Sequence, residues 1–235
     1  MRHLSPLGQP VQLEQLLAQR ADLWLGRGLP AAAPSGVPTG FTALDAALPW
    51  RGWPRGSLSE IVTAQQGAGL ALALPMLIAL SRQPRWLLLV NPPLIPYAPA
   101  LAAYGLDLTR LVVVRTSVQA GVQAGAEHTW AWAMEQGLRS GACAAVMAWP
   151  DARSDQGAER PNRSGKRSVG SLLRRLQLAA DTGDALAILL RSPPATVQPS
   201  PAALRLAVQC AGAGLTVTLL KQRGGRPGSE IQLGG

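Results

Sequence analysis

Short apolar runs alternate with helix-like segments along most of the chain, and this alternation limits the fold more than any other feature. Five runs are apolar on both faces, which is typical of parallel strands covered by helices on each side. They span residues 58–63, 86–90, 111–115, 143–149 and 185–190. Apolar residues recur at helical spacing in residues 42–48, 68–81, 98–104, 127–140 and 169–180. The sequence therefore predicts an α/β domain with a mainly parallel central sheet flanked by helices.

The two ends of the chain lack the alternation of strands and helices that is found in the middle. Residues 1–28 carry one apolar stripe at helical spacing, and glycines and a proline end that helix, so we expect a short amphipathic helical arm. Residues 29–38 are rich in Pro and Ala and uncharged, as in a linker. We expect the compact domain to span 39–223 and a flexible tail to follow from 224 to 235. Strands at 204–208 and 215–220 are expected to pair antiparallel at the sheet edge.

The chain is strongly basic. Lys and Arg number 22 against 13 Asp and Glu, a formal charge of +9. This excess favours a polyanionic partner such as nucleic acid, although a genome rich in arginine codons would produce the same composition. Between residues 160 and 175 six cations occur with no acid, and residues 151–170 are polar enough to form a mobile loop. The candidate nucleic-acid-binding residues are Arg153, Arg160, Arg163, Lys166, Arg167, Arg174 and Arg175. Because this loop lacks stacking aromatics, we expect weak, salt-sensitive and sequence-blind binding to single strands.

A strand followed by a glycine-containing turn and a helix is the form of a phosphate loop, and it occurs at residues 60–70. Such a loop needs a Lys for the outer phosphates and a Ser or Thr hydroxyl for Mg²⁺. The positions at issue instead hold Gly67, Ala68, Gly69 and Leu70. A helix N-terminus with two glycines still leaves weak anion binding open. We therefore interpret this segment as a degenerate phosphate loop, which lacks the Lys and the hydroxyl residue.

No other catalytic constellation replaces it. The acids are scattered, His128 has no neighbouring nucleophile, and Trp149 and Pro150 end the strand where an NTPase would place a metal-holding Asp. The two cysteines, Cys143 and Cys210, lie in apolar runs and are expected in the core. They lie far from any metal-like spacing, and His3 and His128 are the only histidines in addition, so we expect no zinc site. We expect no enzyme activity, no metal and no cofactor.

No run is long enough to cross a bilayer, because the longest, residues 68–80, falls short of about 18 residues. No secretory apolar region follows Met1. The expectation is a cytoplasmic protein that does not bind membranes.

Several blocks resemble the core of RecA-type recombinases, in the same order and over residues 38–223. The blocks read PTGFTALDAALPWRGWPRGSLSEI, VNPPLIPYAPALAAYGLDLTRLVVV, GLRSGACAAVMAW and LLRRLQLAA. Together they are most similar to the ImuA family, SulA-related and RecA-like accessory proteins of bacterial damage-inducible mutagenesis. The resemblance implies a degenerate RecA-like core and control by the SOS response. The implied partners are an ImuB-type polymerase-like subunit, an error-prone replicative-type polymerase, RecA and single-stranded DNA, with association with the nucleoid during DNA damage.

The resemblance also implies where this chain departs from a recombinase. A recombinase would place its phosphate-loop Lys and Thr near Gly69 and Leu70, a catalytic Glu near Pro92 or Pro93, a metal Asp near Trp149 and a sensing Gln near Ser192. All four features are absent. The segment 151–170 falls at the first mobile DNA-facing loop and 193–200 at the second, which lacks cations and aromatics.

Partner-binding residues follow from the same resemblance. Lys221 and Arg223 match a pair of cations that a recombinase projects toward a neighbour, although ordinary basic residues after an edge strand fit equally well. The arm is expected to dock on a partner or on its own core. The candidate partner-binding residues are Leu13, Leu16, Leu17, Trp24, Lys221 and Arg223.

The sequence thus favours a non-catalytic scaffold of translesion DNA synthesis. Two alternatives remain at this point: a DNA-dependent ATPase of the recombinase class, against which four positions argue, and a SulA-type inhibitor of cell division.

Overall fold

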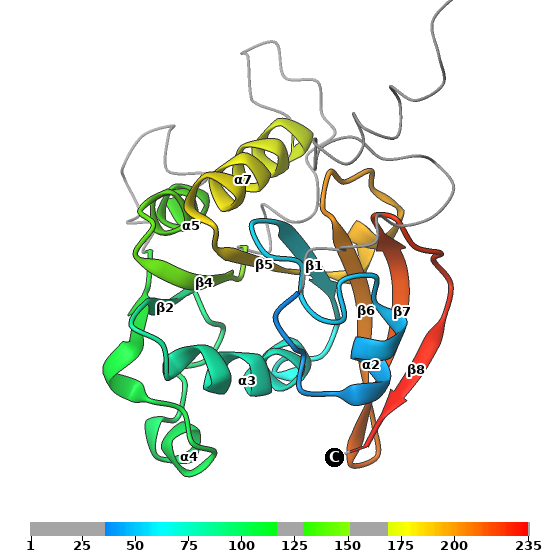
Figure 1. Cartoon of the computed structure of the whole chain (residues 1–235), viewed down its shortest axis with the longest axis horizontal. Coiled ribbons are helices and arrows are strands. Elements are labelled where there is room, and N and C mark those ends of the chain that lie inside the picture. Colours follow the sequence, from blue (N-terminus) through cyan, green and yellow to red (C-terminus); the bar gives the residue numbers. More distant parts are fainter. Residues whose placement is uncertain (1–35, 117–128, 151–168, 235) are drawn as a thin grey trace, which may run out of the picture. The chain divides into compact units, whose positions relative to one another are not determined.

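The computed structural model describes residues 36–116, 129–150 and 169–234, and within them a single eight-stranded sheet holds the chain together (Figure 1). The strand order is β3-β2-β4-β5-β1-β6-β7-β8. The first six strands in this order are parallel to their neighbours, and β7 and β8 continue antiparallel. The α/β class and the antiparallel pair at the edge are confirmed. The strands are β1 (Leu58–Val62), β2 (Trp86–Val90), β3 (Leu111–Val114), β4 (Cys143–Ala148), β5 (Leu186–Arg191), β6 (Leu204–Ala211), β7 (Gly214–Gln222) and β8 (Glu230–Leu233).

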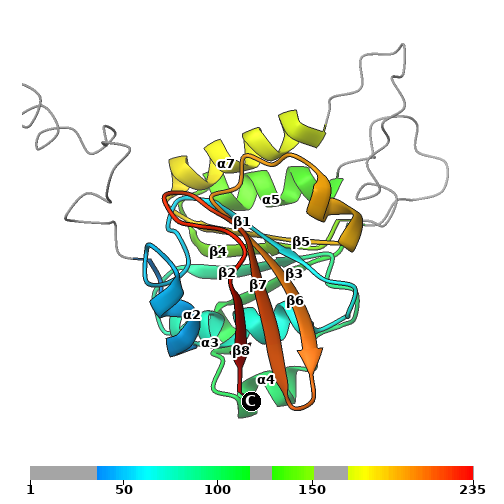
Figure 2. The same ribbon diagram turned by 90° about the vertical axis from the view of Figure 1, so that its right-hand side faces the viewer.

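Helices cover both faces of the sheet, as the two-sided apolar strands require. Figure 2 shows α5 (Thr129–Arg139) and α7 (Val169–Gly183) on one face. The other face carries α2 (Thr42–Ala47), α3 (Ala68–Ser81) and α4 (Ala98–Ala103). Short 3-10 turns, η1 (Leu108–Arg110) and η3 (Pro193–Val197), complete the described elements.

Successive strand residues enter different cores, which explains why the strands are continuously apolar. In β2, Leu87 and Leu89 pack with α3, whereas Leu88 and Val90 pack with α5 and α7. Each buried leucine removed from water contributes about 1.5–3 kcal/mol, so both layers hold the sheet.

Both predicted boundaries of the compact domain are wrong. Val37, assigned to the linker, is 5% exposed and exchanges two backbone hydrogen bonds with Trp53, at 2.9 and 2.7 Å. At the other end, residues 230–233 of the predicted tail form β8, which pairs with β7 and buries Leu233. Short segments of three or four residues carry too little periodicity to be recognised as strands. The rest of the arm and linker, residues 1–35, lies outside the described residues.

The cysteines differ from each other. Cys143 is buried in β4, as expected, but Cys210 is exposed at the end of β6, so its prediction as a core residue is wrong. Cys210 lies at the end of β6, where residues 209–211 are all exposed, so an apolar run there does not indicate burial.

Close contact between α5 and α7 depends on Gly183. A Cβ atom at this position would lie 1.8 Å from the carbonyl oxygen of Leu138 in α5. In most helices Gly→Ala stabilises, by up to about 1 kcal/mol. Here the methyl group meets backbone, which has no rotamer with which to move aside.

We predict that Gly183→Ala lowers the free energy of unfolding by about 1–3 kcal/mol, the usual cost of overpacking. Urea unfolding followed by circular dichroism measures it. Gly234→Ala is the matched control, because nothing lies within 4 Å of its added methyl. A stabilised Gly183→Ala variant would show that the two helices are not in contact at this point.

Candidate functional site

A cleft of about 760 Å³ lies where the carboxyl ends of β1, β2, β4 and β5 meet. Its walls are the β1–α3 connection, Asn91 and the prolines after β2, Trp149 and Pro150 after β4, and Arg191 and Ser192 at the end of β5. Arg115 and Thr116, after β3, close one side. Parallel α/β sheets bind ligands at this edge, outside the carboxyl ends of the strands. The cleft is therefore the candidate site that the fold itself provides.

The charges in the cleft are few and of one sign. Of the described residues that line it, only Arg115 and Arg191 are charged, and none is a lysine or a carboxylate. Arg115 is exposed, and its Nη2 donates to the Pro92 carbonyl at 3.4 Å. These walls can donate hydrogen bonds to an anion, but their side chains offer no carboxylate to hold Mg²⁺ or to accept a proton.

The degenerate phosphate loop occupies the expected place. Gly67 precedes α3 with φ 91°, a conformation that glycine adopts without strain, and is exposed. Gly69 is buried, and a Cβ atom there would lie 2.1 Å from Cδ1 of Leu190 in β5. Ala68 is buried and Leu70 packs partly against the α3 core. The turn and helix of a phosphate loop are present, while its charged and hydroxyl positions are filled by packing residues.

The loop is tied to other elements by its own side chains. The Gln65 amide donates to Oγ1 of Thr63 at 3.1 Å, and the Gln65 side-chain oxygen accepts a hydrogen bond from the backbone of Cys210. Across the cleft, Asn91 adopts φ 53° and joins β2 to the residues after β3. Its Nδ2 donates to Oγ1 of Thr116, and its Oδ1 accepts from the Thr116 amide, both at 2.7 Å. Two rims of the cleft are thus held by side-chain hydrogen bonds.

Sequence reasoning missed a buried ion network beside the cleft. Glu60 of β1, Arg191 of β5 and Arg205 of β6 are 0%, 4% and 6% exposed. Glu60 Oε1 lies 3.4 Å from Nη1 of Arg191, and Glu60 Oε2 accepts from Nε of Arg205 at 2.5 Å. Each of the three strands carries a single charged residue, which was the available signal. The strand order that brings the three residues together cannot be read from any one strand.

The same network fixes the connection after β5. Arg205 donates from Nη2 to the Ala195 carbonyl at 2.6 Å, and Arg191 donates to the Gln198 side chain at 2.7 Å. Residues 193–200, which the resemblance implies as the second DNA-facing loop and which lack cations and aromatics, lie in this connection. Residues 193–197 form η3, and Ala195 is fully buried. Two guanidinium groups thus hold the connection against the sheet.

Lys221 of β7 belongs to this region as well. Its Nζ donates to the Ser200 carbonyl at 2.6 Å. Burial lowers the pKa of Lys221 below its usual value, and the nearby positive charges of Arg223 and Arg205 lower it further. Arg223 is exposed, and its amide donates to the Ala203 carbonyl. Of the two cations predicted to face a partner, Arg223 has its side chain exposed, whereas Lys221 is half-buried against Ser200.

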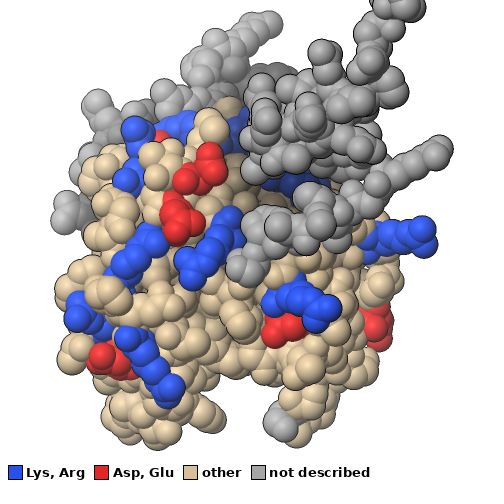
Figure 3. Space-filling view, in the orientation of Figure 1, with Lys and Arg blue, Asp and Glu red and all other residues tan. Residues whose placement is uncertain are grey.

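The predicted nucleic-acid-binding residues are only partly described. Arg174 of α7 is exposed, but Arg175 pairs with Glu135 of α5, which also lies 3.7 Å from Arg139. Arg175 therefore joins two helices. Figure 3 shows basic side chains near α5 and α7 and further ones lower on the same face. The remaining predicted contacts lie outside the described residues: Arg153, Arg160, Arg163, Lys166, Arg167, Leu13, Leu16, Leu17 and Trp24.

Other kinds of site lack support in the described part of the chain. Residues 36–116, 129–150 and 169–234 contain no group of three or more His, Cys, Asp or Glu placed to hold a metal ion. Burial raises the pKa of the Cys143 thiol, which disfavours the thiolate. Among the same residues no helix is both long and apolar enough to span a bilayer.

Comparison with known proteins adds little to this geometry. No family model and no curated protein matches the chain. Among solved structures, the chain is similar to SulA from Pseudomonas aeruginosa, with 22% identity over 57% of this chain and 97% of that one, at a TM-score of 0.39. A likeness at this TM-score assigns neither a family nor a function.

We predict that Glu60→Gln lowers the free energy of unfolding by about 3–5 kcal/mol, because it leaves two buried guanidinium groups without a carboxylate. Chemical denaturation in urea measures the loss. Glu230→Gln removes the same charge from an exposed position in β8 and serves as control. Equal stability of the two variants would mean that water, not Glu60, compensates the arginines.

Proposed function

We propose that this protein is a non-catalytic accessory subunit of damage-induced translesion DNA synthesis. It binds a polymerase-like subunit of the ImuB type, and its RecA-like core does not hydrolyse nucleotides. The observation that carries the proposal is the composition of the cleft. Its described lining offers two arginines and no lysine or carboxylate. The sequence blocks that resemble the ImuA family supply the biological context.

The chemistry of phosphoryl transfer explains why the cleft matters. A phosphate loop works by clamping the β- and γ-phosphates with a lysine and by holding Mg²⁺ through a hydroxyl and an acid. Leu70, at a position where such a loop would supply a side chain, packs partly against the core, and Arg191 of the cleft is paired to Glu60. The β1–α3 loop and the rims of the cleft are held by packing and by hydrogen bonds within the chain, and this supports a scaffold function.

Association with RecA, with the error-prone replicative-type polymerase and with single-stranded DNA belongs to the same proposal. The net charge of +9 supports a polyanionic partner, and Arg174 offers an exposed cation on α7. The segment at the position of the second DNA-facing loop forms η3 and has neither cations nor aromatics, which favours weak contact with DNA over the grip of a filament.

Co-purification tests the partnership. We predict that the full chain co-purifies with an ImuB-type subunit when the two are co-expressed, and that deletion of residues 1–28 reduces the recovered partner at least tenfold. The physical reason is the apolar stripe of Leu13, Leu16, Leu17 and Trp24, which a partner groove would bury. A full-length variant with these four residues changed to Ser is the matched control. It removes the apolar stripe without shortening the chain, and we expect it to lose the partner as the deletion does.

Three outcomes would contradict the proposal. Full recovery of the partner without the arm would remove the arm from the interface. ATP turnover that is stimulated by single-stranded DNA and abolished by Arg115→Ala would make the protein an ATPase. Filamentous cells on overexpression, with damage-induced mutation unchanged on deletion, would favour a division inhibitor.

We predict that the triple variant Arg163→Glu, Lys166→Glu, Arg167→Glu binds single-stranded DNA more weakly and with a shallower salt dependence. Each lost phosphate contact reduces the slope of log affinity against log salt by about 0.7. Fluorescence anisotropy of a labelled oligonucleotide over a salt series measures both. The control carries the same charge change at three exposed arginines elsewhere, Arg51, Arg82 and Arg226. If the two variants lose the same affinity, the effect belongs to net charge and not to the basic segment.

A further inference from the structure

Helix α5 places a large aromatic ring on the surface of the molecule. Trp132 is 65% exposed, and its side chain makes no hydrogen bond and no ring contact within the described residues. Trp130, two residues earlier in the same helix, is buried in the core between helix and sheet. The two tryptophans therefore have different roles, because Trp130 packs the fold whereas the ring of Trp132 is open to a ligand.

The ring lies on the outer face of a pair of helices. In α5 the exposed residues Trp132, Gln136 and Arg139 follow one another at intervals of four and three, which places them on one face of the helix. In α7, Arg174 and Leu178 are exposed at an interval of four. The two helices lie side by side on the same face of the sheet (Figures 1 and 2). Their outer faces together form one surface that carries an aromatic ring and cations.

The charges of this helix pair are mostly positive. The Arg139 and Arg175 side chains are 61% and 39% exposed, and both contact the Glu135 carboxylate, which is only 9% exposed. Arg174 is exposed and makes no ion pair within the described part of the chain. Asp181, two turns after Arg174, is the one exposed carboxylate that the two helices carry. Three guanidinium groups thus stand against two carboxylates, and one of these carboxylates is already paired.

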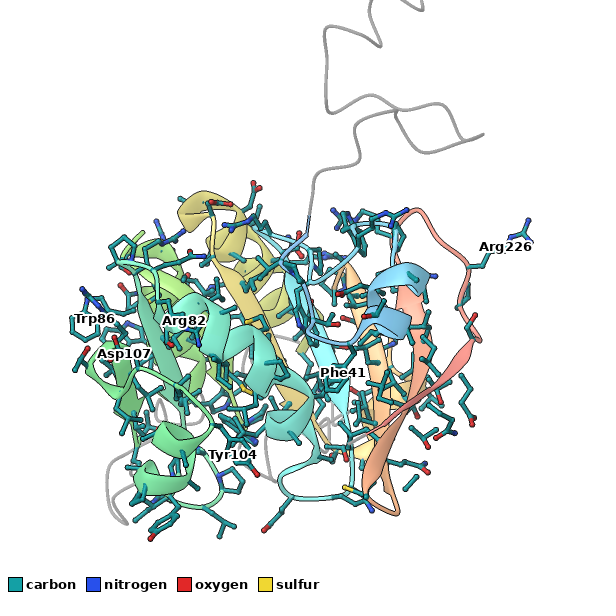
Figure 4. All side chains as sticks on the ribbon, turned by 60° about the horizontal axis from the view of Figure 1, so that its bottom comes forward. Phe41, Arg82, Trp86, Tyr104, Asp107 and Arg226 are labelled. Carbon is teal, nitrogen blue, oxygen red and sulfur yellow. The ribbon has the colours of Figure 1, made fainter. Side chains whose placement is uncertain are left out.

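A second exposed tryptophan lies in a less suitable environment. Trp86 is 40% exposed, and the guanidinium of Arg110 lies 5.6 Å from the centroid of its ring. Figure 4 shows Asp107 on the same side of the molecule as Trp86. A ring that already has a cation over it, on a side with an acid that repels phosphates, is a poor platform for a nucleic acid. Trp132 meets neither obstacle.

We propose that Trp132 stacks on a base of a single-stranded nucleic acid while Arg174 and Arg139 bind the neighbouring phosphates. Non-specific binders of single strands combine a cationic surface with aromatic rings on which bases stack. The basic segment 151–170 lacks such a ring in its sequence. The contact between α5 and α7 supplies one beside the helix that follows this segment. The proposal deepens the proposed contact with single-stranded DNA and rests on it.

Anisotropy of fluorescein-labelled oligothymidine with the full chain tests the stacking. Trp132→Ala should bind about tenfold more weakly, as expected for the loss of one stacked base. The salt dependence of its affinity should be that of the wild type, because no phosphate contact is lost. Trp132→Phe keeps a ring and should bind within about threefold of the wild type. Tyr104→Ala is the matched control, since Tyr104 is 68% exposed and follows α4 on the other face of the sheet.

A sugar–phosphate chain of the same length without bases separates stacking from charge. The wild type and Trp132→Ala should bind this chain equally, whereas Arg174→Ala should bind it more weakly and with a salt slope reduced by about 0.7. Oligouridine of the same length distinguishes the two sources of a base. A tenfold loss on either strand supports the stacking, and the strand that the wild type binds more tightly identifies the ligand as DNA or RNA. Urea unfolding confirms that each variant is folded.

Four outcomes would overturn the stacking. Three leave the proposed contact with DNA intact: Trp132→Ala binds oligothymidine like the wild type, Tyr104→Ala loses as much affinity, or Trp132→Ala is equally weakened on the chain without bases. Failure of the wild type to bind either strand at about 0.1 mM would overturn both. Loss of the ImuB-type subunit by Trp132→Ala, with unchanged binding of DNA, would accompany the first outcome and assign the ring to a protein interface.

Discussion

Glu60 pairs with two buried arginines at the centre of the sheet, and much of the carboxyl edge depends on that one carboxylate. Arg191 and Arg205 come from strands on either side of β1, so the three charges meet only in this strand order. Removing a charge from water is costly unless it is paired and hydrogen-bonded. Both guanidinium groups meet that requirement by also binding the connection after β5. The arrangement therefore orders a segment that would otherwise extend freely from the rim of the cleft.

The cleft lies where α/β enzymes bind their ligands, but its described walls contain no lysine and no carboxylate. Its place at the carboxyl ends of parallel strands follows from the topology alone. Its side chains do not follow from topology, and here they hold the loops: Asn91 binds the residues after β3, and Gln65 reaches the end of β6. Such hydrogen bonds stiffen the walls of the cleft. They also occupy polar groups that a nucleotide would otherwise recruit.

The sequence predicted most of the fold because the parallel strands are short apolar runs, α3 is a longer apolar run, and α5 and α7 are amphipathic. Helix 68–81 and strand 86–90 have the predicted bounds. Errors concentrate where the signal is short or non-local. β8 has four residues, and Val37 contributes a single bridge, so neither shows a period. The ion network, and the pairing of Arg175 with Glu135, depend on contacts between residues far apart in the chain, which no local pattern reports.

The degenerate loop was predicted by the same local reasoning, since the missing Lys and hydroxyl are visible by spacing. The spacing does not reveal how the start of α3 packs against β5 at these positions. Gly69 lies so close to β5 that any side chain there would meet Leu190. A side chain introduced at this position would therefore require the end of the Leu190 side chain to move aside. The start of α3 and the end of β5 are thus fitted to each other through a residue without a Cβ atom, and a lysine at position 69 would first have to displace its neighbour.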